Sequence, residues 1–383
     1  KLPSSTDYAI GRLPVLHEGR IKPMDTLARH SLLQIQGRLK LPDASSPSFW
    51  FFSLLTGSVA YDQSNIILVE HPKLFDSIHS KYRKQKYRVS ESFLKDHIDL
   101  IEPFISSAIL LEKEQRSTFQ QAAFLLANRY QTYQSISQQL FPFDDGSQLG
   151  FWNKMLRLSQ SMSADKLDSS PEFKAFLVYY DQLQKNTSTM YVIFGDSWTT
   201  LPKAALDPKQ SKRSLLSNYL LLSDAFLSND QDQIKRYSDA IVSEFKLNFP
   251  KQAFLLQLEY VFNIINPFIV ALFLYLIIVF LVFLTRFFNM SNGPSFIIST
   301  WILALGFHTF GLIARMLILM RPPVINLYSS AIFIAFVTSI IGFIMYRKTR
   351  YLFFAGYIAT LSALSLIVAY HLSLSGDTLE VMQ

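Results

Sequence analysis

His308 is the residue whose type and position most clearly indicate chemistry, because it lies within a long apolar segment. Residues 296–320 are apolar apart from His308 and Arg315 and a few hydroxyls. In an α-helix with a rise of 1.5 Å per residue, His308 would lie about 12 residues, or about 18 Å, from either end of the segment. A polar group at that depth in a membrane is costly, and it usually faces a partner or a cavity.

Arg315 follows His308 by seven residues, so the two side chains share one helix face. An imidazole deep in a membrane helix, with a guanidinium nearer the surface, can hold a metalloporphyrin. The iron would take the ring nitrogen of His308, and Arg315 would pair with a propionate. The alternative is a histidine that is hydrogen-bonded inside a helix bundle and binds no cofactor.

Two further groups of candidate residues lie toward the same side of the membrane as Arg315. Arg321, Asn326 and Tyr328 belong to a stiff, proline-containing connection in which Asn326 can cap the next helix. They are candidates for the rim of a ligand site, or for a plain helix connector. His371 lies near the end of the last apolar segment. Its depth differs from that of His308 by roughly a dozen ångströms, which argues against one shared iron. Two sites, a relay or an interfacial histidine without a ligand remain open for it.

Four apolar segments must position these residues. Each has about the 20 residues that a membrane-spanning helix needs, and they cover approximately residues 264–288, 296–320, 326–346 and 351–373. Short connections predict antiparallel neighbours. We therefore predict a mostly α-helical chain in two domains. Residues 1–250 form a helical domain with minor strand content, and residues 251–383 form a four-helix transmembrane bundle.

The basic residues of the short loops predict the orientation of the bundle. Arg286, Arg347, Lys348 and Arg350 lie on one side, whereas the opposite loop holds Arg321, with Arg315 just inside it. The side with more basic residues is expected in the cytoplasm. The helical domain and the tail 375–383 would then be extracytoplasmic, at a bacterial inner membrane.

Charge and composition exclude several classes of function. Residues 1–250 hold 29 Lys and Arg against 26 Asp and Glu, and residues 251–383 hold seven against three. The net charge of +7 is thus shared between a balanced domain and loop arginines, and it does not indicate nucleic acid as a partner. Without cysteine, the chain has no disulfide, thiolate metal ligand or cysteine nucleophile. It begins at Lys1 with no visible signal peptide, so we interpret it as a processed or excised piece.

Helical spacing predicts three helices in the first domain. Apolar residues repeat every three or four positions over 119–140, where Phe141-Pro142-Phe143-Asp144-Asp145-Gly146 ends the pattern. A shorter helix begins after Pro23 and ends near Gly37, and a third covers 234–245. Residues 66–69 and 190–194 are the best strand candidates.

Two polar motifs stand out in the first domain. Residues 11–29 contain two Gly-Arg pairs and two prolines, and they are either an N-terminal strap over the domain or a binding segment. Residues 81–88 are basic with interleaved tyrosines. Such a run can hold phosphates or carboxylates, but it is more typical of a solvated surface.

The combination of these motifs resembles the CcsA/ResC-type cytochrome c assembly proteins. His308-Thr309-Phe310-Gly311-Leu312-Ile313-Ala314-Arg315, followed by Arg321-Pro322-Pro323-Val324-Ile325-Asn326-Leu327-Tyr328-Ser329-Ser330, is similar to their arginine-containing helix and outer loop. Residues 13–29 resemble the extracytoplasmic domain of the longer members. Glu259-Tyr260, Asn263 and Pro267-Phe268 are similar to the entry into the first membrane helix.

The resemblance implies a component that handles haem b for covalent attachment to apocytochrome c. It implies as partners apocytochrome c, membrane lipid and a ResB-type companion subunit or fused half. The family's tryptophan-rich segment is not in this chain, whose only tryptophan in the membrane region is Trp301. We therefore expect the haem lyase chemistry to need another segment or polypeptide. His308 would be the candidate iron ligand, with Arg315, Arg321, Asn326, Tyr328 and His371 as cofactor-binding residues. The alternatives are a non-catalytic, partner-binding or structural subunit without haem, and half of a transporter or sensor.

Overall fold

The computed structural model describes residues 4–17, 19–41, 45–56, 65–78, 87–137, 171, 174, 192–194, 197–199, 213–324 and 326–373. The chain is mostly helical, with few and short strands, and it divides into two compact units, Lys1–Ala253 and Phe254–Gln383. Within these described ranges, four helical segments are long and apolar enough to cross a membrane. The breaker 141–146, residues 81–86 of the basic run and the tail 375–383 lie outside the described residues.

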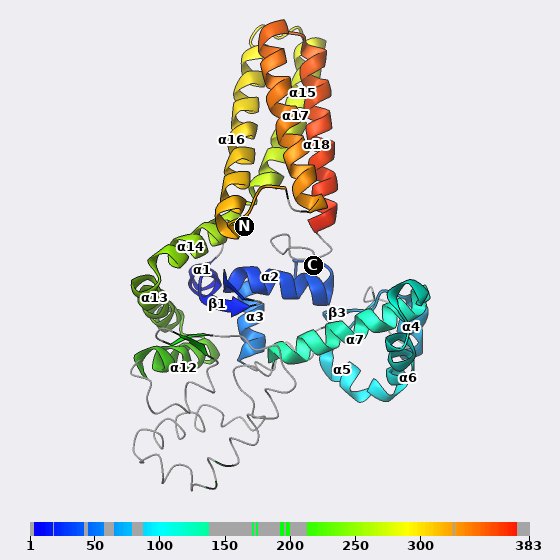
Figure 1. Cartoon of the computed structure of the whole chain (residues 1–383), viewed down its shortest axis with the longest axis vertical. Coiled ribbons are helices and arrows are strands. Elements are labelled where there is room, and N and C mark those ends of the chain that lie inside the picture. Colours follow the sequence, from blue (N-terminus) through cyan, green and yellow to red (C-terminus); the bar gives the residue numbers. More distant parts are fainter. Residues whose placement is uncertain are drawn as a thin grey trace. The chain divides into compact units, whose positions relative to one another are not determined.

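In the described part of the N-terminal unit most residues lie in helices (Figure 1), and the strands form three two-stranded antiparallel pairs. Its elements before the long helix α7 are α1 (Ser5–Gly11), β1 (Pro14–His17), β2 (Arg20–Pro23), α2 (Met24–Gln36), α3 (Pro47–Leu55), β3 (Ile67–Leu68), α4 (Pro72–Ile78), β4 (Arg88–Val89), α5 (Glu91–Asp96), α6 (Ile98–Ile109) and the 3₁₀ turn η1 (Lys113–Gln115). Among the residues that the structure describes, these are followed by α7 (Thr118–Ser137), β5 (Val192–Phe194), β6 (Ser197–Thr199), α12 (Arg213–Leu227) and α13 (Gln231–Asn248).

Residues 11–29 form a hairpin and the start of a helix. β1 pairs with β2 in a register that joins Pro14 to Pro23 and His17 to Arg20, and Gly19 has a φ of 73°, which glycine adopts without strain. Asp25, in the first turn of α2, accepts hydrogen bonds from Ser48 on α3 (2.9 Å) and from Arg29 (2.6 Å). The motif therefore has a structural role in joining α2 to α3.

The predicted helix of residues 119–140 is α7, which begins at Thr118 and is described as far as Ser137. Its Arg129 is buried and ties three segments together, because it donates to the carbonyl oxygens of Gln34 (3.1 Å) and Leu68 (3.0 Å) and pairs with Glu70. The shorter predicted helix is α2, closed by Gly37 with a φ of 71°. Both strand candidates contain a strand. β3 is shorter than the predicted 66–69, and β5 covers the described part of 190–194, since residues 190 and 191 lie outside the described residues.

Tyr130 on α7 makes the stability of this unit decrease with rising pH in the alkaline range. Burial, with the nearby Glu91 carboxylate, raises the pKa of Tyr130 to about 12, and its hydroxyl donates to Glu91 at 3.4 Å. Between about pH 10 and about pH 12 the unfolded chain loses a phenol proton that the folded chain keeps, so stability falls as the pH rises. Tyr130→Phe should make this fall shallower in unfolding midpoints measured across that range. If Tyr130→Phe left the slope of unfolding midpoint against pH unchanged, this role would be contradicted. Tyr237→Phe on α13 is the control and should keep the slope of the parent chain.

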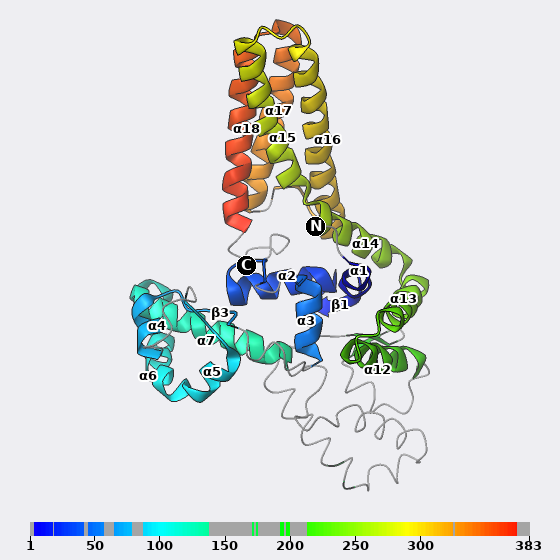
Figure 2. The same cartoon turned by 180° about the vertical axis from the view of Figure 1, so that it is seen from behind.

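The C-terminal unit is an antiparallel bundle of four long helices, which Figures 1 and 2 show from opposite sides. These are α15 (Pro267–Phe287), α16 (Gly293–Leu319), α17 (Leu327–Thr349) and α18 (Leu352–Ser373). The four predicted segments correspond to them within a few residues. α14 (Pro250–Ile265) precedes α15, and Asn266, whose φ is 48°, separates the two helices. The break arises because Pro267 disfavours the helical conformation at the residue before it.

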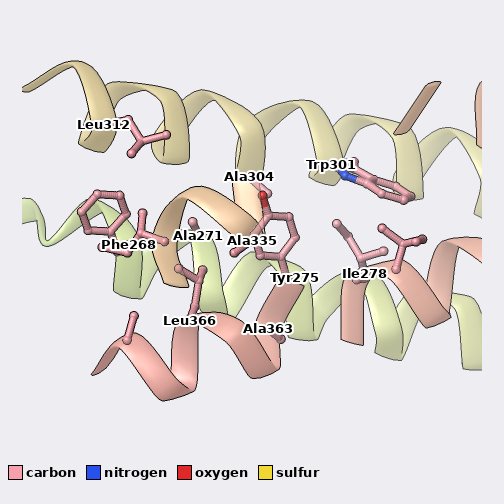
Figure 3. Packing of buried hydrophobic residues seen from close by; sticks show 14 of the residues in the cluster. Phe268, Ala271, Tyr275, Ile278, Trp301, Ala304, Leu312, Ala335, Ala363 and Leu366 are labelled. Atoms are coloured by element: carbon pink, nitrogen blue, oxygen red, sulfur yellow. The ribbon is translucent and has the colours of Figure 1, made fainter. Parts of the chain in front are cut away.

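Packing within the bundle is uneven. α15 packs closely against α16 and α18, and α18 packs closely against α17, whereas α16 and α17 share a smaller contact. Small residues allow the close approaches, as at Gly342 on α17, which lies against Ile358 of α18. Figure 3 shows Phe268, Ala271, Tyr275 and Ile278 of α15 in the shared interior, with Trp301, Ala304 and Leu312 of α16.

Candidate functional site

His308 lies in the interior of the bundle, with no exposed surface, and both of its ring nitrogens are engaged. Nε2 lies 3.1 Å from the carbonyl oxygen of Ile332 on α17, and Nδ1 lies 3.2 Å from the hydroxyl of Tyr275 on α15. A carbonyl oxygen only accepts, so Nε2 carries a hydrogen, and in a neutral ring Nδ1 then accepts from the tyrosine hydroxyl. Through its two ring nitrogens, His308 on α16 is joined to α15 and α17.

Aromatic rings fill the space around this imidazole. The centroid of the His308 ring lies 5.3 Å from that of Phe336, 5.7 Å from that of Phe268 and 6.1 Å from that of Tyr275. In Figure 3 the Tyr275 ring extends from α15 with its oxygen toward α16. A second polar contact joins α16 to α17, where the indole of Trp301 donates to the hydroxyl of Ser339 at 2.8 Å. Side-chain hydrogen bonds and aromatic contacts thus both join α16 to α17.

Arg315 and the following loop form a separate polar group. The Arg315 side chain is buried, and its guanidinium carbon lies 4.7 Å from the centre of the Tyr328 ring, in a cation–π contact. Asn326 caps α17 and accepts from the backbone nitrogen of Ser329 at 2.8 Å. This confirms the capping role that the sequence predicts for Asn326. Arg315, Asn326 and Tyr328 therefore fix the start of α17.

Arg321 and His371 are exposed. Both belong to the end of the bundle where α16 and α18 finish and α15 and α17 begin, which we call the α16–α17 end (Figure 1). Among the residues that the structure describes, neither side chain makes a hydrogen bond or an ion pair. An imidazole and a guanidinium are therefore accessible at the same end of the bundle.

These surroundings decide which residues fit a haem. His308 does not fit as an iron ligand. Both of its ring nitrogens are engaged in hydrogen bonds, so neither offers a lone pair to iron, and aromatic rings occupy the adjacent space. His371 and Arg321 do fit by their chemistry, since an exposed imidazole can ligate iron and an exposed guanidinium can pair with a propionate. Over the described ranges, no three His, Cys, Asp or Glu side chains gather as a metal-ion site.

Tyr275 and Ser339 are the site residues that sequence reasoning missed. A signal for Tyr275 is present, because it is a lone tyrosine within the first apolar segment and a buried phenol usually has a hydrogen-bond partner. The pairing of Tyr275 with His308, 33 positions away, depends on how α15 and α16 pack.

The chain was also compared with known proteins. No family model and no curated protein sequence matches it.

Proposed function

We propose that this protein is a membrane component of cytochrome c biogenesis that handles haem for covalent attachment to apocytochrome c. It would lie in a bacterial inner membrane with the N-terminal unit outside the cytoplasm. The observation that carries the proposal is that an exposed imidazole, His371, and an exposed guanidinium, Arg321, belong to the end of the bundle that also holds the Arg321–Ser330 segment. That segment, together with residues 308–315, is one of the parts of the sequence that resemble the cytochrome c assembly proteins.

Different residues of the bundle would bind the haem and hold the binding site in position. His371 would hold the iron, Arg321 would pair with a propionate, and Arg315, Asn326 and Tyr328 would keep the loop in position. His308 would keep α15, α16 and α17 in register and so support the site from within. Haem b supplies the vinyl groups that become thioethers with cysteine thiols. A ResB-type companion or fused half would provide the tryptophan-rich segment that this chain lacks.

Haem loading of the purified full chain in detergent tests this assignment. We expect His371→Ala to lose most of the bound haem and to change the absorption spectrum of what remains. Arg321→Gln should weaken binding about tenfold, the worth of one charge-assisted pair. His308→Ala should keep the coordination spectrum and lower only the thermal midpoint.

Two controls separate binding from damage to the fold. His97→Ala, in the N-terminal unit, should change neither haem content nor spectrum. His371→Tyr keeps a side chain that can ligate iron but should shift the spectrum. If His308→Ala abolishes the iron coordination and His371→Ala leaves it intact, the iron site has been assigned to the wrong histidine.

A structural subunit that holds no haem is the second candidate function. The observation in its favour is that His308, the deepest histidine, has both nitrogens committed to neighbouring helices. In that case the full chain, expressed with a haem supply, would carry no Soret absorption. It would also gain none on titration with haem, and the His371 and Arg321 variants would behave like the parent protein.

A further inference from the structure

The N-terminal unit contains a cleft of about 480 Å³ that the proposed function does not use. It lies between the start of α4, the turn η1 and the first turns of α7. Of the seven residues that line it, Ala122 is apolar and the other six have polar side chains, which are Glu70, His71, Lys113, Arg116, Thr118 and Gln121. Most of these groups donate hydrogen bonds, so the cleft is suited to an acceptor.

Arg116 is fixed in place before any ligand arrives. Its Nε donates to the carbonyl oxygens of Ala108 (2.8 Å) and Leu111 (3.0 Å), and its guanidinium lies over the Phe124 ring at 3.9 Å. The two Nη groups make no hydrogen bond or ion pair with the described residues. A guanidinium held in this way presents two parallel donors without further loss of side-chain entropy.

His71 and Lys113 add donors to the same cleft. The backbone nitrogen of Lys73 donates to Nδ1 of His71 at 3.2 Å, which leaves the hydrogen of a neutral ring on Nε2. The ring is also held edge-on to Phe119, with centroids 5.4 Å apart. Lys113 is exposed, and it forms no ion pair within the part of the chain that the structure describes. The cleft thus combines one mobile cation with two oriented donors.

The carboxylate of Glu70 does not cancel this positive charge, because Arg129 already pairs with it. Arg129 also donates to two backbone carbonyl oxygens, which hold its guanidinium outside the cleft lining and beside Glu70. The net charge that faces a ligand therefore comes from Lys113 and Arg116. Attraction of an anion is the expected result.

Two features of α7 strengthen the preference for an anion. Thr118 begins a helix of 20 residues, whose first turn carries partial positive charge. The side-chain oxygen of Gln121 is buried with no hydrogen-bond partner. Rotation of its amide would turn the NH₂ group to that position, where it can donate to a ligand.

We propose that this cleft binds an oxyanion of the carboxylate or phosphate class, with Arg116 as the fork that orients it and Lys113 as the second charge. His71 Nε2 and the Thr118 hydroxyl complete the donor set. The site lies in the N-terminal unit and does not depend on haem binding by the bundle. Its test therefore fails or succeeds independently of the proposed function.

Calorimetric titration of the full chain in detergent with inorganic phosphate, and separately with succinate, tests the site. Lys113→Gln should weaken binding about tenfold, and Arg116→Gln should weaken it at least as much. Lys95→Gln, an exposed lysine on α5 outside the cleft, is the matched control and should leave binding unchanged. Because Arg116 also holds carbonyl groups of its own loop, the Lys113 variant decides the outcome if Arg116→Gln does not fold.

A second arm separates a free anion from a lipid headgroup. The full chain is reconstituted in nanodiscs of phosphatidylcholine alone or with phosphatidylglycerol, and phosphate is titrated into each. Weaker apparent phosphate binding in the phosphatidylglycerol discs, with this difference between the two discs lost in Lys113→Gln, would identify the lipid phosphate as the ligand. Equal binding in both would identify a free anion. Equal phosphate and succinate binding by the parent chain and Lys113→Gln would overturn the proposal.

Discussion

Asp25→Ala should lower the free energy of unfolding of the N-terminal unit by about 3 kcal/mol, through loss of a buried, charge-assisted hydrogen-bond network. Asp25 is 5% exposed and accepts from both Ser48 and Arg29. Ser48 is 2% exposed, so its hydroxyl would be left without this acceptor in the interior. The carboxylate also lies in the first turn of α2, where negative charge is favourable.

Hydrogen exchange of peptides from α2 and α3 measures this loss where it occurs, because exchange reports local and global opening separately. Asp25→Asn keeps an acceptor of the same shape and should recover part of the stability. Asp232→Ala, an exposed acid in the first turn of α13, is the matched control and should cost less than about 1 kcal/mol. Equal protection in Asp25→Ala and the parent chain would show that the network is not needed.

Gly342→Ala should destabilise the bundle by about 2 kcal/mol or more, because the added carbon has no room. A Cβ built at Gly342 would lie 2.1 Å from Cγ2 and 2.9 Å from Cβ of Ile358. Ile358 is β-branched and on a helix, so its χ1 is restricted and it cannot turn away. Either α17 and α18 separate or the helices shift along each other, and both lose packing.

Thermal unfolding in detergent measures this effect. Two further variants test whether the loss of stability comes from the contact between Gly342 and Ile358. Gly306→Ala on α16 meets no atom within 4 Å. It should be neutral or slightly stabilising, because alanine is the better helix former by up to about 1 kcal/mol. Ile358→Ala removes the clashing branch, so the double variant with Gly342→Ala should be less destabilised than the sum of the two single variants. Strict additivity would mean that the two residues do not meet.

Structural features that depend only on neighbouring residues could be predicted from the sequence. The four membrane helices could be predicted because about 20 consecutive apolar residues are sufficient for a spanning helix, whatever the rest of the chain does. The cap at Asn326 and the end of α2 at Gly37 were also local, since each depends on a few neighbouring residues. The hairpin within residues 11–29 was missed, because its strands are only four residues long and Gly-Pro spacing alone does not distinguish a hairpin from a strap.

The environment of His308 was decided only by the tertiary structure. The sequence established that an imidazole lies in the middle of a membrane helix, and this left a haem ligand and a buried hydrogen-bonded histidine as alternatives. The choice depends on whether other helices offer an acceptor and a donor at hydrogen-bond distance. Those groups are the carbonyl of Ile332 and the hydroxyl of Tyr275, 24 and 33 positions away. Such distances in sequence are bridged only when the helices pack, so no local pattern could reveal them.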